Sequence, residues 1–243
     1  MAHGTPDWGL TAGVKTTYQL TDLAELAARL WAIDRFDRRG DVVYQTSFEY
    51  PGEPFLLSST SGGVQDLSTG SVRSGAFAGR LGHDGSAGSG ITLSVRVPYP
   101  VLSRFGFELS VDLDATLASL FLQVAAYDGA QETIFGVRWL ASTQVLAVLQ
   151  PDGSYANLAT GLPLATTFAA WQTFKLVADF AAASWSRVIL NERTYVPTTG
   201  PRLTVPAVTV PYLAFQVQAN GDGLGVAGQA YIDDAILTQN EPA

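Results

Sequence analysis

Apolar and polar residues alternate with a period of two over most of this chain. In Phe105–Leu113 the apolar positions are 105, 107, 109, 111 and 113, and glycine or polar residues stand between them. Such alternation predicts a β-strand with one face in the core and the other facing outward. Turn sequences such as Asp128-Gly129 and Pro151-Asp152-Gly153 separate similar segments and predict hairpins.

The same pattern predicts strands from residue 42 to the end of the chain. They are Val42–Glu49, Ala76–Leu81, Ile91–Val97, Phe105–Leu113, Leu117–Tyr127, Glu132–Leu140, Gln144–Gln150, Tyr155–Leu158, Trp171–Phe180, Trp185–Leu190, Thr194–Val196, Tyr212–Ala219 and Gln229–Thr238. We expect the Ser-, Thr- and Gly-rich segment Ser58–Ser71 to be surface loop with one short strand. Short strands punctuated by turns, without intervening helices, predict an all-β antiparallel sandwich or barrel.

The last predicted strand, Gly228–Leu237, contains two adjacent aspartates. Strict alternation places Ala230, Ile232, Asp234 and Ile236 on one face and Tyr231, Asp233, Ala235 and Leu237 on the other. At least one of Asp233 and Asp234 should then lie near the core or the sheet rim, where an unpartnered carboxylate is costly. The pattern therefore predicts a hydrogen-bonding partner or a cation for this pair.

The first 40 residues have a different pattern. Residues 1–20 show no clean periodicity but keep large apolar groups, whereas Thr21–Arg38 has the helical spacing of apolar residues. We predict an N-terminal extended arm and one α-helix that form an assembly element over residues 1–40, followed by a β-domain over 41–243. The expected assembly residues are Trp8, Leu10, Val14, Tyr18, Leu23, Leu26 and Leu30. The alternative is that the arm packs along its own domain.

Composition excludes several classes of protein. Apolar residues make up 47% of the 243 residues, which is enough for a large core, and the chain has no cysteine and therefore no disulfide. A net charge of −8 argues against nucleic-acid binding, and no apolar run reaches the ~18–20 residues of a membrane span. The N-terminus lacks a basic stretch followed by an apolar one, so we expect no signal peptide.

Several segments resemble known jelly-roll families. Trp171–Leu190, followed by Asn191, resembles the concanavalin A-like and laminin-G-like domains. Two other pieces, Ser47-Phe48-Glu49 with Val72–Phe77 and the closing Tyr231–Asp234, resemble the carbohydrate-binding modules of xylanases and cellulases. The resemblance implies a jelly-roll β-sandwich and a structural calcium site at Glu49, Asp233 and Asp234. From the residues alone, these carboxylates could equally cap turns or pair with Arg73 or Arg80.

The N-terminal opening, MAHGTPDW, lies outside both families and resembles a bacteriophage virion protein. This resemblance implies a non-enzymatic structural protein of the virion, a capsid decoration or tail component that forms a homo-oligomer and contacts other virion proteins. The alternative is an extracellular carbohydrate-binding module with a glycan ligand. For that function we expect exposed aromatic side chains at Trp139 and Tyr155.

A glycoside hydrolase is the third alternative. Glu108, Asp112 and Asp114 share the polar face of one predicted strand, and Asp112 and Asp114 would lie ~7 Å apart, within the range of catalytic carboxylate pairs. Acids on the polar face of a strand are usually solvated, and no sequence motif of a nucleophilic or metal hydrolase is present. We therefore expect no catalytic residues.

Overall fold

The fold is an antiparallel β-sandwich of two sheets. The structure, a computed structural model, describes residues 40–49, 55–60, 63–86, 90–167, 170–206, 210–221 and 225–242. All strand pairings among these residues are antiparallel, and the described part of the chain contains no helix. The predicted arm, helix and assembly residues all lie in residues 1–39, outside the described part.

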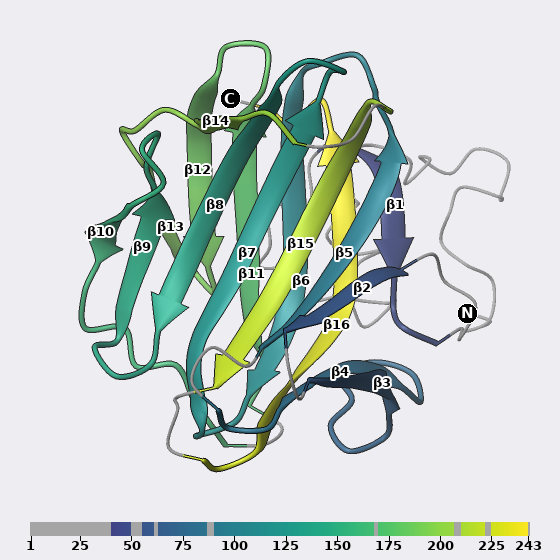
Figure 1. Ribbon diagram of the computed structural model, residues 1–243, viewed down its shortest axis with the longest axis vertical. Coiled ribbons are helices and arrows are strands. Elements are labelled where there is room, and N and C mark those ends of the chain that lie inside the picture. Colours follow the sequence, from purple (N-terminus) through teal and green to yellow (C-terminus); the bar gives the residue numbers. More distant parts are fainter. Residues whose placement is uncertain are drawn as a thin grey trace, which may run out of the picture. The chain divides into compact units, whose positions relative to one another are not determined.

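Sheet A lies behind sheet B in the view of Figure 1. Its strand order is β13-β12-β11-β6-β16-β4-β3, and β1 also pairs with β16. The strands are β1 (Asp41–Thr46), β3 (Val64–Ser68), β4 (Ala78–His83), β6 (Arg104–Leu113), β11 (Gln172–Asp179), β12 (Ser184–Leu190), β13 (Arg193–Tyr195) and β16 (Gly228–Gln239). The pairing of β1 with β16 brings the first described strand beside the last one.

Sheet B has the order β10-β9-β8-β7-β15-β5-β2, and β14 pairs with β8. Its strands are β2 (Phe55–Thr60), β5 (Gly90–Pro98), β7 (Leu117–Tyr127), β8 (Glu132–Leu140), β9 (Val145–Leu149), β10 (Tyr155–Ala159), β14 (Arg202–Thr204) and β15 (Tyr212–Gly221). The predicted hairpin of β7 and β8 is confirmed at both strands. The short strand expected within Ser58–Ser71 is confirmed as β3, whereas β2, which ends inside this segment, was not predicted.

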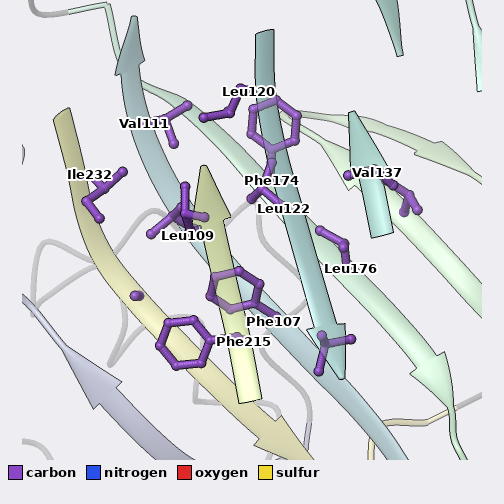
Figure 2. Packing of buried hydrophobic residues seen from close by; sticks show 14 of the residues in the cluster. Phe107, Leu109, Val111, Leu120, Leu122, Val137, Phe174, Leu176, Phe215 and Ile232 are labelled. Atoms are coloured by element: carbon purple, nitrogen blue, oxygen red, sulfur yellow. The ribbon is translucent and has the colours of Figure 1, made fainter. Parts of the chain in front are cut away.

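The core lies between the two sheets. Phe107, Leu109 and Val111 of β6 meet Leu120 and Leu122 of β7 and Phe215 of β15, as Figure 2 shows. The rings of Phe107 and Phe215 stack across the sandwich with their centroids 4.4 Å apart. The alternating apolar positions predicted for Phe105–Leu113 are all buried in this core. No helix in the described residues is long and apolar enough to cross a membrane.

The last strand departs from the predicted alternation. Between Asp233 and Ile236, β16 advances three residues while β6 advances two, and Asp234 has a φ of 49°. This is a β-bulge, which inserts one extra residue and resets the side-chain alternation. Consequently Ala230, Ile232, Ala235 and Leu237 all belong to the core, and the prediction that the two aspartates face opposite sides of the sheet is wrong.

Candidate functional site

The two aspartates of the bulge in β16 hold the loop that precedes β4. Both backbone N–H groups of Arg73 and Ser74 donate to Asp233 Oδ2 at 3.0 Å, and the Ser74 hydroxyl donates to Asp234 Oδ1 at 2.8 Å. The Arg73 guanidinium lies 3.3 Å from Asp234 Oδ2 and also donates to the Ser110 hydroxyl. One of the two expected alternatives, pairing of a carboxylate with Arg73, is therefore observed at Asp234.

Burial raises the pKa of the Asp233 carboxyl to about 6. The adjacent Asp234 charge adds to this rise, whereas the N–H bonds from Ser74, Asp234 and Arg73 oppose it. Desolvation of the charged form is the largest of these effects, because no part of Asp233 is exposed. Asp233 is thus a buried carboxyl group whose pKa approaches neutral pH.

Glu49 holds the same loop from the other end. Its Oε1 atom accepts the N–H groups of Ala76 at 2.8 Å and Phe77 at 2.9 Å. Gly75 has a φ of +71°, and a Cβ atom there would lie 2.1 Å from Glu49 Oε1, so only glycine fits between the carboxylate and the loop. The prediction that Glu49 and the Asp233–Asp234 pair meet when the first and last strands pair is confirmed, because all three residues contact this loop.

This arrangement does not match a calcium site. Calcium requires several oxygen ligands around one point. Here the carboxylate oxygens accept N–H and O–H groups, and a guanidinium occupies the charged position beside Asp234. Within the described ranges, no three His, Cys, Asp or Glu side chains gather where they could hold a metal ion. Calcium therefore stays a prediction from the family resemblance.

The polar face of sheet A is buried rather than solvated. Glu108 and Asp112, the candidate catalytic carboxylates, have exposed fractions of 4% and 0%. Asp112 accepts the Ser71 hydroxyl, and Asp114 accepts the N–H and the hydroxyl of Thr116 at 2.9 and 3.0 Å in a turn. The expectation that acids on this face are solvated is wrong for Glu108 and Asp112.

A buried group of ions lies on the same face. Glu241 follows β16 and is 2% exposed. Its two carboxylate oxygens lie 2.8 Å from Lys175 Nζ and 2.9 Å from Arg187 Nη2. Thr238 also donates its hydroxyl to Glu241 Oε1 at 2.6 Å. A buried carboxylate shared by two cations fixes the C-terminal end of the chain against sheet A.

The outward surface of sheet B carries a different set of side chains. We call it the sheet B face, and it is the front of the sandwich in Figure 1. The antiparallel register brings polar residues of neighbouring strands side by side on it. They include Ser94, Phe121, Gln123, Arg138, Tyr155, Gln216, Gln218 and Asn220.

Side-chain amides form a row across β15 and β7 that consists of two hydrogen-bonded groups. Gln123 Nε2 donates to Gln216 Oε1 at 2.5 Å, and Ser94 of β5 lies opposite Gln216. Along β15, Gln218 Nε2 donates to Asn220 Oδ1 at 2.9 Å, and Asn220 Nδ2 donates to Ser119 Oγ at 3.2 Å. The three amide side chains on β15 are only partly buried, so each retains donor or acceptor capacity toward solvent.

An aromatic pair with a cation adjoins this amide row. The rings of Phe121 and Tyr155 meet edge to face with their centroids 5.8 Å apart. Arg138, directly opposite Phe121 on β8, places Cζ 4.1 Å from the Tyr155 centroid and 5.6 Å from the Phe121 centroid. Burial raises the pKa of the Tyr155 phenol, and the positive charges of Arg138 and Arg202 oppose this rise.

The two aromatic residues predicted to bind a glycan differ in their placement. Tyr155 is partly exposed and lies on the sheet B face. The expected exposure of Trp139 is wrong: its exposed fraction is 1%, and its ring NH donates to the Leu162 carbonyl at 3.2 Å inside the core. The neighbouring Arg138 points outward instead. Sequence reasoning did not identify Phe121, Gln123, Arg138 and Gln216 as site residues. The alternation shows that these positions face outward, but it does not show which outward residues bind a ligand.

Comparison with known proteins gives a fold but no sequence family. No protein-family model matches the sequence, and no curated protein sequence matches it. An endo-β-1,4-glucuronan lyase from the fungus Trichoderma reesei superposes with a TM-score of 0.56 at 13% identity, covering 82% of this chain and 96% of that chain. The chain has a lectin-like jelly-roll fold.

Two further structures share this fold. A carbohydrate esterase from the Shiga toxin-encoding bacteriophage phi24B superposes with a TM-score of 0.54 at 13% identity, covering 83% of this chain and 100% of that chain. A galectin-like protein of unknown function from Bacillus subtilis gives a TM-score of 0.53 at 10% identity, with coverage of 83% and 97%. At these identities the likeness extends to the jelly roll and not to individual residues.

Proposed function

We propose that this protein is a non-enzymatic glycan-binding jelly roll and that the sheet B face is its binding surface. The observation that carries the proposal is the juxtaposition of the amide row with the Phe121–Tyr155 pair on one continuous sheet surface. Sugars present C–H surfaces that pack on aromatic rings and hydroxyl groups that bond to amides. The sheet B face offers both kinds of group within neighbouring strands.

The shared fold supports this function without assigning it. Two of the proteins with the same jelly roll are described as a glucuronan lyase and a carbohydrate esterase, so both act on carbohydrates. The carboxylates that the sequence suggested for catalysis, Glu108 and Asp112, lie on β6 of the other sheet and are buried. We therefore propose binding without hydrolysis at the sheet B face.

A glycan array followed by calorimetry with soluble polysaccharides tests the proposal. We expect binding by the intact chain and a loss of affinity of about tenfold or more in Phe121→Ala and Tyr155→Ala, as is typical when an aromatic contact at the centre of an interface is removed. Phe77→Ala removes a 37% exposed aromatic ring outside the sheet B face and serves as the control. Unchanged affinity in both test variants would exclude this face.

We propose as a second function that the protein is a virion component, either a capsid decoration or a tail protein. The apolar residues of the N-terminal arm support this proposal, as does the jelly roll shared with a bacteriophage esterase. A glycan-binding face and a virion location are compatible. The alternative location is extracellular.

Deletion of residues 1–40 tests the assembly role of the N-terminal segment. We expect the intact protein to be a homo-oligomer and the truncated protein to be a folded monomer, because the apolar arm and helix would supply the contacts between copies. Light scattering gives the mass, and circular dichroism checks that the β-domain remains folded. An unchanged oligomeric mass would contradict the assembly role.

A further inference from the structure

The basic residues of the two sheets are engaged differently. On sheet A, the ion pairs between described residues are Arg73–Asp234, Arg80–Asp66, Arg104–Asp179, Lys175–Glu241 and Arg187–Glu241. On sheet B, the described residues offer no carboxylate within ion-pair distance of Arg96, Arg138 or Arg202. Within the described ranges of this chain, whose net charge is −8, the cations without a carboxylate partner are Arg96, Arg138 and Arg202 of sheet B and Arg193 at the edge of sheet A.

Arg138 is held in place by rings rather than by an acid. Its guanidinium packs over Tyr155 and near Phe121, which orients the group without neutralising its charge. The Arg138 Nε atom is buried and has no hydrogen-bond partner in the described structure. A buried guanidinium NH without an acceptor is costly.

A second cation lies near the first. Arg202 of β14 places its guanidinium against the turn before β10, where a Cβ atom on Gly153 would lie 3.2 Å from Arg202 Cζ. Both Arg138 and Arg202 lower the pKa of the Tyr155 phenol through their charges, so both guanidiniums lie in the neighbourhood of this residue.

One carboxylate of sheet B, Glu132, lies at the opposite end of β8 from Arg138. Glu132 accepts the hydroxyls of Tyr212 at 2.5 Å and Thr204 at 2.9 Å. It is six residues from Arg138 along the strand, which corresponds to roughly 20 Å. Among the described residues, Arg138 therefore has no carboxylate within ion-pair distance.

We propose that the glycan bound by the sheet B face is a uronate-containing, acidic polysaccharide, and that Arg138 binds the carboxylate of one sugar. The planar guanidinium fork matches a carboxylate in two parallel hydrogen bonds. The aromatic rings of Phe121 and Tyr155 pack against the sugar, and the Gln123–Gln216 row bonds to its hydroxyls. This inference rests on the proposed glycan-binding function and adds the class of ligand.

Calorimetry on the full chain tests the inference by comparing acidic polymers with their neutral counterparts. The probes are polygalacturonate, alginate and polyglucuronate, each compared with its carboxyl-reduced, neutral form. We expect binding of at least one acidic polymer, at least tenfold weaker binding of its reduced form, and weakening with added salt. In Arg138→Gln, affinity for the acidic polymer should fall tenfold or more. Arg193→Gln, which removes one exposed charge on β13 of sheet A, should leave it unchanged.

The outcomes separate the two proposals. Equal binding of the acidic and reduced forms, or binding of neutral polysaccharides alone, would overturn the acidic ligand and leave glycan binding intact. Binding of no polysaccharide would overturn both proposals. If Arg138→Gln alters the far-ultraviolet circular dichroism, Arg202→Gln replaces it, because Arg202 is exposed and lies on a short outer strand. If a folded Arg138→Gln or, in its place, a folded Arg202→Gln variant binds the acidic polymer with full affinity, the inference is also overturned.

Discussion

Asp233 gives the protein a pH dependence of stability that a single residue controls. Its carboxyl has a pKa of about 6 in the folded protein and an ordinary value of 3.8 otherwise. Between these values the folded state holds a proton that the unfolded chain releases, so this group stabilises the fold at low pH. Its contribution is full below pH 3.8 and is lost as the pH rises through 6.

We expect Asp233→Asn to remove this part of the pH dependence. The free energy of unfolding of the native protein should fall relative to that of the variant between pH 4 and pH 7, by on the order of 3 kcal/mol. Urea unfolding of both proteins across this range measures the difference. Parallel pH profiles for the two proteins would show that Asp233 is already ionised at low pH.

At the scale of the element, the bulge in β16 makes one residue dispensable. Asp234 is the extra residue, and Ala230, Ile232, Ala235 and Leu237 would still alternate correctly without it. We expect deletion of Asp234 to preserve the fold, at a cost of about 1–3 kcal/mol for the lost contacts with Ser74 and Arg73.

Deletion of Ile236, two residues further on, is the matched control for the bulge. It would turn Leu237 out of the core and Thr238 into it, which places an apolar side chain in water and a hydroxyl in the core. We expect this variant to lose cooperative unfolding in urea. A folded Ile236 deletion, or an unfolded Asp234 deletion, would contradict the assignment of the extra residue.

At the scale of the whole molecule, the stacked rings of Phe107 and Phe215 couple sheet A to sheet B. Both residues are fully buried, and they come from strands that do not hydrogen-bond to each other. In a double-mutant cycle with Phe107→Leu and Phe215→Leu, we expect the loss of unfolding free energy in the double variant to differ from the sum of the single losses by a coupling energy of about 0.5–1.5 kcal/mol. Urea unfolding of the four proteins measures it.

Phe105→Leu and Phe215→Leu form a control cycle for the pair. Phe105 is equally buried but stacks edge to face on Phe180 of its own side of the sandwich. The losses of unfolding free energy in Phe105→Leu and Phe215→Leu should therefore be additive within a few tenths of a kcal/mol. Additive losses for Phe107 and Phe215 would show that the stacked rings contribute only through buried area.

Strands could be predicted wherever the core imposes strict alternation. In Leu117–Tyr127 and Glu132–Leu140, every second side chain packs between the sheets, so the sequence carries the period that the strand requires. The alternation failed at Asp234, because the bulge depends on contacts with a loop some 160 residues earlier in the chain. It also missed β2, because the sequence FLLSST does not alternate between apolar and polar residues.

The site residues divide in a similar way. Glu49 and Asp233 could be linked from the sequence, because a sandwich that pairs its first and last strands brings them to one loop. The prediction of an outward-facing Tyr155 is confirmed, but that of an exposed Trp139 is wrong: the tryptophan is buried, and the adjacent Arg138 faces outward. Two neighbouring residues of a strand must face opposite sides, and the choice between them follows from the register with β7.

The sequence by itself determined the all-β class, the hairpins and the core positions of regularly alternating strands such as Phe105–Leu113, because burial on one face of a sheet imposes a local period on the chain. Only the tertiary structure decided which cations are paired and which are not. Charge pairing depends on residues that are distant in sequence, such as Arg73 with Asp234 and Lys175 with Glu241. The proposed ligand depends on arginines of the sheet B face that have no carboxylate partner among the described residues, and this becomes visible only when the strands are assembled into sheets.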